Sequence, residues 1–135
     1  MKRVFDAFAV LCWLQQESGW ERVHSYLLQA TDGKLVIALS AINVGEIYYR
    51  LVRIAGAQKG ESFLLDVRRR VFPWSVIPAS NKRVWQAARL KGVYRISYAD
   101  AFAIALAQEL NAPLLTGDPG ILDLPSPGIK VEPLV

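Results

Sequence analysis

Four carboxylates of the sequence stand where short apolar segments end or where helices are expected to begin. They are Asp6, Glu46, Asp100 and Asp118. Carboxylates gathered at one place repel one another unless protons or a cation intervene. Oxygen ligands of this kind suit Mg²⁺ or Mn²⁺, which keep positions open for water and phosphate. If the fold brings the four side chains together, they would form a site for a divalent metal.

A single cysteine, Cys12, and a single histidine, His24, limit the other kinds of metal site. One cysteine excludes an internal disulfide and a cysteine-based zinc cluster. One histidine excludes His-rich motifs such as H-E-x-x-H. Any metal site in this chain must therefore be built from oxygen ligands.

Two other acid-dependent protein classes do not fit the sequence. An aspartyl-nucleophile phosphatase would need a second acid two residues after the first, and position 8 is Phe. A receiver-like signalling domain would need an adjacent acidic pair after its first strand and a late lysine at a strand end, and neither is visible.

Structural explanations remain open for each acid. Asp100 completes the capping box that Ser97 begins, and Glu46 has Arg50 four residues further on as a helical ion-pair partner. Asp118 stands in a Gly-Asp-Pro-Gly turn, where Asp is common. An acid at position 6 is the hardest to explain structurally, because an unpaired charge between apolar segments is costly.

Hydrophobic periodicity and turn residues predict alternating strands and helices. The expected strands are 4–6, 35–39, 74–77, 114–116 and one near 130–132; the expected helices are 7–16, 20–30, 41–54, 62–70, 81–91 and 97–110, with a loop over 119–128. Such alternation implies right-handed crossovers and a mostly parallel sheet with helices on both faces. A chain of 135 residues fits one domain, 1–135, of the α/β class.

In this architecture active sites form at the carboxyl ends of the strands. Asp6 and Asp118 follow predicted strands, whereas Glu46 and Asp100 lie in the first two turns of predicted helices. All four acids are therefore expected at one edge of the sheet, with their side chains converging.

Charge is distributed unevenly along the chain. Segment 47–95 holds eleven bases and two acids, a net charge of +9, while the remainder holds five bases and ten acids, a net charge of −5. The basic segment could supply a surface for phosphates, or it could be a solvated surface without a ligand. No run of about 20 apolar residues is present, so no membrane span is expected. The first residues lack the pattern of a signal peptide, which favours a cytoplasmic location.

Four segments carry a resemblance to a known family. They are Val4-Phe5-Asp6, Asn43-Val44-Gly45-Glu46, Ser97-Tyr98-Ala99-Asp100-Ala101 and Leu114-Leu115-Thr116-Gly117-Asp118-Pro119. In order and spacing, over nearly the whole chain, they resemble the PIN-domain family, most of all its VapC-type toxin ribonucleases. The resemblance implies a PIN-like α/β/α sandwich in which the four acids hold Mg²⁺ or Mn²⁺ and cleave RNA. It also implies a small antitoxin as partner and a homodimer.

The sequence departs from the family pattern in two places. The first acid of the family is usually followed by Thr or Ser, whereas Ala7 and Phe8 stand here. The loop after Asp118 often carries a further acid two or three residues on, and Asp123 is displaced from that place. Thr116 is retained and would position Asp118. A second interpretation therefore stays open: a catalytically weakened PIN-like protein that acts as an RNA- or protein-binding module.

The first interpretation is metal-assisted hydrolysis of RNA phosphodiesters, which needs no side-chain nucleophile. The bases expected to hold the RNA backbone are Arg50, Arg53, Arg68, Arg69 and Arg70. Helices within 41–70 also carry more apolar and aromatic side chains than one small core can cover, which predicts a homodimer contact or a partner groove. These side chains are Tyr48, Tyr49, Leu51, Phe63, Leu64 and Leu65.

Overall fold

A five-stranded sheet forms the middle layer of the computed structural model, which describes residues 1–125 and 127–135. The strand order is β3-β2-β1-β4-β5, and each pair of neighbouring strands is parallel. The strands are β1 (Lys2–Phe5), β2 (Val36–Ser40), β3 (Ser75–Ile77), β4 (Leu114–Thr116) and β5 (Val131–Pro133). The prediction of an α/β fold with a mostly parallel sheet is confirmed.

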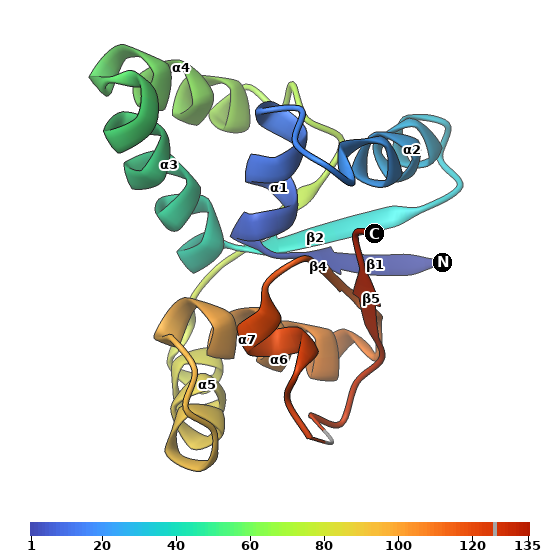
Figure 1. Ribbon diagram of the computed structural model, residues 1–135, viewed down its shortest axis with the longest axis vertical. Helices are drawn as coiled ribbons and strands as arrows, with labels where there is room; N and C mark the ends of the chain where they lie inside the picture. Colours follow the sequence, from blue (N-terminus) through green and yellow to red (C-terminus); the bar gives the residue numbers. More distant parts are fainter. Residues whose placement is uncertain (126) are drawn as a thin grey trace.

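Helices cover both faces of this sheet (Figure 1). One layer consists of α1 (Ala7–Leu14), α2 (Trp20–Thr31), α3 (Ala41–Ala55) and α4 (Ala57–Arg68); the other consists of α5 (Asn81–Val93), α6 (Tyr98–Leu110) and the short α7 (Pro119–Leu122). The chain is therefore an α/β/α sandwich, as expected. Within the described residues, no helix combines the length and the apolar character needed to cross a membrane.

Each helical layer packs on its own hydrophobic core. Successive side chains of a strand point to opposite faces, so Ile37 and Leu39 of β2 join the core under α1–α4 while Ala38 joins the core under α5 and α6. Helix α6 is buried from Ala101 to Ala107. Its small alanine side chains let the helix lie close against the sheet, which fixes the position of its N-terminal turn.

Helix boundaries differ most from the sequence prediction in two places. Helix α4 begins at Ala57, directly after Gly56 and five residues earlier than predicted, and it runs through Gly60. A Cβ at Gly60 would lie 2.5 Å from the side chain of Val52, so glycine permits α3 and α4 to pack closely. The predicted loop 119–128 contains α7, which starts with Pro119 directly after the capping residue Asp118. Position 126 of that loop lies outside the described residues.

The C-terminal strand is tied to the start of the chain by a buried carboxylate. Glu132 of β5 accepts hydrogen bonds from Arg3 Nε at 2.6 Å and from the hydroxyl of Tyr26 at 3.2 Å, and Arg22 lies 3.5 Å away. Because Glu132 is 6% exposed, these cations compensate a charge that water does not reach.

The apolar residues of α3 and α4 are only partly covered. Phe63 is buried, whereas Tyr49 and Leu65 remain 44% and 42% exposed. The homodimer or partner contact expected at these helices stays a prediction.

Candidate active site

The predicted site residues follow strands and begin helices at the carboxyl edge of the sheet. Asp6 comes directly after β1, and Asp118 comes two residues after β4. These two strands are hydrogen-bonded neighbours. Glu46 lies in the second turn of α3 and Asp100 in the first turn of α6. In Figure 1 the first turns of α1, α3 and α6 gather at this end of the sheet.

Asp6 is almost completely enclosed, with 2% of its surface exposed. Its Oδ1 accepts the N–H of Ala9 at 2.8 Å and thereby caps α1, and its Oδ2 accepts the hydroxyl of Thr116. Burial raises the pKa of Asp6 to about 7, since it outweighs both hydrogen bonds, and the charges of Asp100 and Asp118 act in the same direction.

Thr116 connects the two acids that follow the strands. Its buried hydroxyl donates to Asp6 and its oxygen accepts the backbone N–H of Asp118 at 3.0 Å. Asp118 in turn accepts the N–H of Gly120 at 2.9 Å and caps α7. One short polar chain therefore fixes the ends of β1 and β4 relative to each other.

Asp100 and Glu46 face the same group of charges from the two helical layers. The pKa of Asp100 is raised to about 7 by burial and by the neighbouring charges of Asp118 and Glu46. Burial also raises the pKa of Glu46, while Arg50, whose Nη1 lies 3.5 Å from its Oε2, offsets part of this effect. Some of the structural roles that the sequence left open are also present: Ser97 Oγ accepts the backbone N–H of Asp100 at 3.1 Å, which is the Ser97 half of the capping box, and Glu46 is paired with Arg50.

Each of the four acids therefore lies near enough to another to feel its charge. In the part of the chain that the structure describes, no three Asp, Glu, His or Cys side chains meet closely enough to hold a metal ion as they lie.

Asn43 is a site residue to which the sequence assigned no role. It is fully buried one turn before Glu46, and its Nδ2 donates to the carbonyl of Ala99 at 3.2 Å, which connects α3 to α6 beside Asp100. Its Oδ1 has no hydrogen-bond partner. The signal available in the sequence was an amide between the apolar residues Ile42 and Val44 of the predicted helix 41–54.

Phe8, which replaces the usual hydroxyl residue of the family, lies against the turn that precedes Asp118. A Cβ at Gly117 would lie 2.5 Å from the Phe8 ring, so the ring and the backbone are in close contact. Phe8 is still 40% exposed. An aromatic surface therefore borders the acids where the resemblance led us to expect hydroxyl groups.

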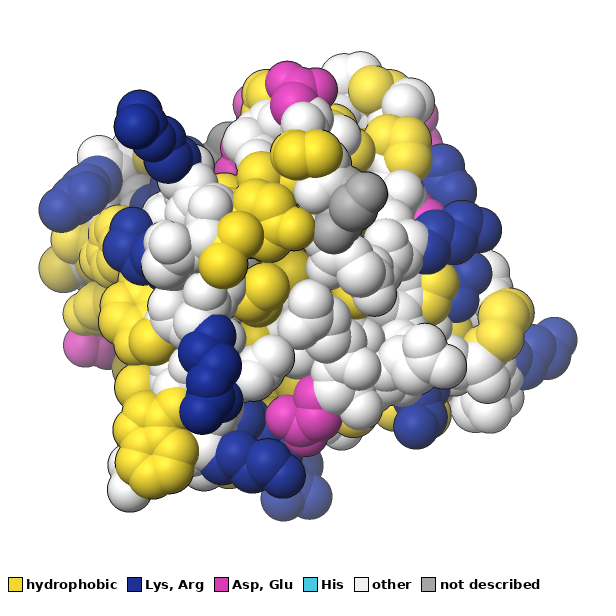
Figure 2. All heavy atoms as spheres, turned by 90° about the horizontal axis from the view of Figure 1, so that it is seen from below, with side chains coloured by type: hydrophobic (Ala, Val, Ile, Leu, Met, Phe, Trp, Pro, Cys, Tyr) yellow, Lys and Arg dark blue, Asp and Glu magenta, His cyan; other side chains and the backbone are white. Residues whose placement is uncertain are grey.

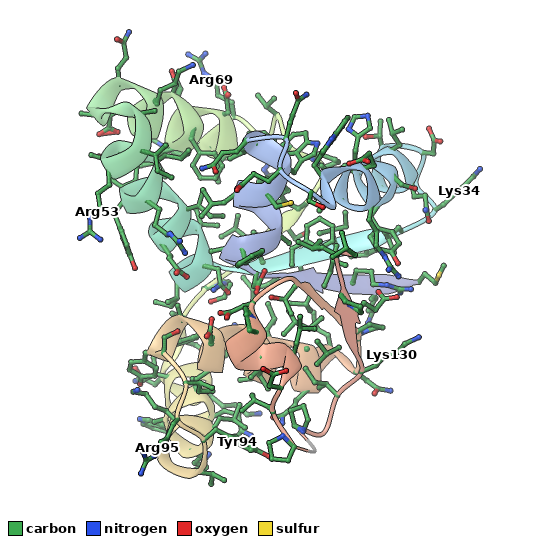
Figure 3. The ribbon with its side chains drawn as sticks, viewed as in Figure 1. Lys34, Arg53, Arg69, Tyr94, Arg95 and Lys130 are labelled. Carbon is green, nitrogen blue, oxygen red and sulfur yellow. The ribbon has the colours of Figure 1, made fainter. Side chains whose placement is uncertain are left out.

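The arginines predicted to hold RNA are spread over α3 and α4. Arg50 reaches the site through its ion pair with Glu46. The guanidinium of Arg53 lies over the ring of Tyr49, 4.9 Å from its centre. Figure 3 shows the side chains of Arg53 and Arg69 pointing outward from the molecule. The remaining two, Arg68 and Arg70, are exposed at the end of α4.

Solved structures with the same fold include several toxin–antitoxin proteins. VapBC2 from Rickettsia felis, bound to a DNA fragment from its promoter, matches with 19% identity over 98% of each chain and a TM-score of 0.70. A toxin–antitoxin complex from Klebsiella pneumoniae matches with 15% identity over 98% of each chain and a TM-score of 0.67. VapC20 from Mycobacterium tuberculosis, a toxin that cleaves the sarcin–ricin loop, matches with 14% identity over 87% of this chain and 90% of its own, with a TM-score of 0.69.

At these identities the likeness shows a shared fold. Among curated protein sequences, none matches the chain significantly. The family model described as "PIN domain" matches residues 4–126, which include every acid of the candidate site. This protein belongs to the PIN-domain family.

Proposed function

We propose that this protein is a divalent-metal-dependent endoribonuclease, the toxin of a toxin–antitoxin pair, which hydrolyses RNA phosphodiesters at Asp6, Glu46, Asp100 and Asp118. The observation that carries the proposal is the placement of these acids at the carboxyl ends of β1 and β4 and in the first two turns of α3 and α6. Burial and like charges raise the pKa of Asp6 and of Asp100 to about 7. Such perturbed acids are typical of sites that bind a cation or transfer protons.

The donor chemistry of the site fits Mg²⁺ or Mn²⁺. All four acids offer oxygen ligands, which these ions prefer, and the unpaired Oδ1 of Asn43 adds a buried acceptor beside Glu46. Because no three of these acids meet in the described residues, an ion bound to the side chains as they lie would have one or two direct carboxylate ligands, with water as its other ligands. When bound, the ion would supply Lewis-acid catalysis, which activates water and stabilises negative charge on the phosphate.

The protein's own groups would hold the acids in place for this reaction. Thr116 keeps Asp6 and Asp118 at a fixed separation through its two hydrogen bonds. Asn43 holds α3 next to α6 through its hydrogen bond to the carbonyl of Ala99. Arg50 offsets part of the effect of burial and of neighbouring charge on Glu46.

The basic segment 47–95 would attract the RNA backbone in the cytoplasm, with Arg50, Arg53, Arg68, Arg69 and Arg70 as the first candidates for phosphate contacts. A small antitoxin and a second copy of the chain are the proposed protein partners. The toxin–antitoxin structures with this fold support the antitoxin, and the exposed apolar side chains of α3 and α4 support the dimer.

The direct test is cleavage of structured and single-stranded RNA with Mg²⁺ or Mn²⁺, with and without EDTA. Asp118→Asn preserves the side-chain oxygen that caps α7, since Asn caps about as well as Asp, but removes the ligand charge. We expect its activity to fall at least about 100-fold, since changes around metal ligands alone cost about 10–100-fold. The exposed Asp32→Asn serves as the matched control. Parental activity in Asp118→Asn would refute the assignment.

One observation favours the alternative of a catalytically weakened binding module. Both oxygens of Asp6 are occupied by internal hydrogen bonds, and Ala7 and Phe8 provide no hydroxyl to orient it. If this alternative holds, the protein binds RNA but no RNA is cut, and Mg²⁺ or Mn²⁺ does not raise the melting temperature.

A further inference from the structure

A pocket on the α5–α6 side of the sheet has no role in the site described above. Its volume is about 240 Å³. It starts at Ser40 and Ile77, the last residues of β2 and β3, and therefore borders the carboxyl edge of the sheet. Ser40 also accepts the N–H of Ile42 and caps α3, the helix that carries Glu46. The pocket and the acids thus share one edge of the fold.

The floor of this pocket is apolar and includes an aromatic ring. Phe102, Ala105 and Leu106 of α6 form it together with Ile77. Protein sites for drug-sized ligands occupy roughly 300–1,000 Å³, so this smaller pocket suits a single flat ring system and not an extended ligand. Phe102 lines the pocket although it is only 5% exposed, so such a ligand could contact the part of the ring that faces the pocket.

The rim of the pocket is basic. Lys82, Arg83 and Arg89 line it together with one acid, Glu109, which gives a local net charge of +2. Arg83 and Glu109 neutralise each other through two hydrogen bonds of 3.0 Å. Arg89 donates to the neutral amide of Gln86 and keeps its full charge. Figure 2, which views this side of the molecule from below, shows Lys and Arg side chains around apolar patches.

We propose that this pocket accepts one unstacked base of the RNA substrate, while Lys82 and Arg89 hold the phosphate next to it. The inference rests on the proposed ribonuclease function and adds a site for reading the substrate. Proteins recognise RNA mainly through unstacked bases that pack on aromatic side chains, combined with cationic contacts to the backbone. An apolar floor beneath a cationic rim matches a nucleotide, which is apolar on the faces of its base and anionic at its phosphate. An apolar side chain of a protein partner could fill the floor of the pocket, but it would have no use for the positive charges of Lys82 and Arg89.

The test is an NMR titration of ¹⁵N-labelled protein in EDTA with the four nucleoside 5′-monophosphates, each compared with ribose 5-phosphate. We expect at least one nucleotide to shift the amide signals of Phe102, Ala105 and Leu106, and ribose 5-phosphate to leave them unchanged. Arg89→Gln should weaken nucleotide binding about tenfold, the effect of losing one hydrogen bond to a charged group. Ala105→Leu should fill the pocket and abolish the shifts.

Arg95→Gln is the matched control, because it also removes one exposed cation but lies outside the pocket, two residues after the end of α5 (Figure 3). Arg89 is exposed as well, so its replacement does not endanger folding. Equal weakening by the two variants, equal shifts with ribose 5-phosphate, or no shifts with any nucleotide would overturn the proposal. Shifts of the same amides that follow protein concentration alone would identify a subunit contact and would also overturn it.

The titration requires neither metal nor cleavage, so the two proposals can fail separately. A protein that cuts RNA but shows no base-dependent shift would refute the pocket alone. A protein that binds nucleotides here but cuts no RNA with any divalent metal would refute the ribonuclease and leave a nucleotide-binding pocket.

Discussion

Replacing Asp100 by Asn should stabilise the metal-free protein at neutral and basic pH. The substitution keeps the size of the side chain and leaves the hydrogen bond between Ser97 Oγ and the backbone N–H of residue 100 intact. It removes a charge that burial and the charges of Asp118 and Glu46 make unfavourable. A residue that acted only as a helix cap would show no such gain, because Asn and Asp cap about equally well.

The size of the effect follows from the pKa of the carboxyl group. A pKa of about 7 in the folded protein, against about 3.9 in the unfolded chain, corresponds to at most about 4 kcal/mol at pH 8. Asp100 is only partly buried and shares its repulsion with Asp118, so we expect about 1–2 kcal/mol. For a chain of this length that raises the melting temperature by roughly 4–8 °C.

The raised pKa of Asp100 also determines how the stability gain of Asp100→Asn changes with pH. Because the folded pKa is raised, the folded state binds the proton more tightly, and this contribution to stability is complete below about pH 4. It is lost as the pH rises through 7. The advantage of Asp100→Asn over the parent should therefore be near zero at about pH 3, below both pKa values, and complete at about pH 8.5.

The measurement is urea or thermal unfolding in EDTA at these two pH values, with Asp32→Asn as the exposed control. Adding Mg²⁺ should stabilise the parent more than the variant, because the ion binds only the folded state and the variant has lost a ligand charge. A variant that is less stable than the parent at pH 8.5, or equally stabilised at both pH values, would refute the account of repulsion among the acids.

Three further substitutions test how the site is held together. Thr116→Val should destabilise the protein by about 1–3 kcal/mol in urea unfolding, since it leaves Asp6 buried without its hydroxyl donor; an unchanged midpoint would show that this bond contributes nothing. Gly117→Ala should cost about 1–3 kcal/mol through the clash with Phe8, and Phe8→Ala should restore most of it in the double variant, whereas additive losses would exclude the clash. Glu132→Gln should cost about 2–4 kcal/mol, because it removes the charge that compensates the partly buried Arg3; unfolding at the parental urea concentration would contradict that role.

The sequence by itself determined the class of the fold and the place of the acids along it. Apolar runs and helical periodicity are local signals, and they located each strand to within two residues or so. Asp6 and Asp118 were recognisable because a charge next to a buried strand is unusual and needs a reason. The alternation of strands and helices then implied a parallel sheet, since parallel strands need crossover connections.

Only the tertiary structure decided which of these segments are neighbours. The bond between Thr116 and Asp6 joins residues 110 positions apart, and no local pattern specifies that β4 pairs with β1. Asn43 became a site residue because α6 packs against α3 and places the Ala99 carbonyl within its reach. The pocket exists because residues of α5 and α6 and the last residues of β2 and β3 come together around it. Periodicity reports which face of an element is buried, whereas the partner of that face is chosen by long-range packing, which the local sequence does not encode.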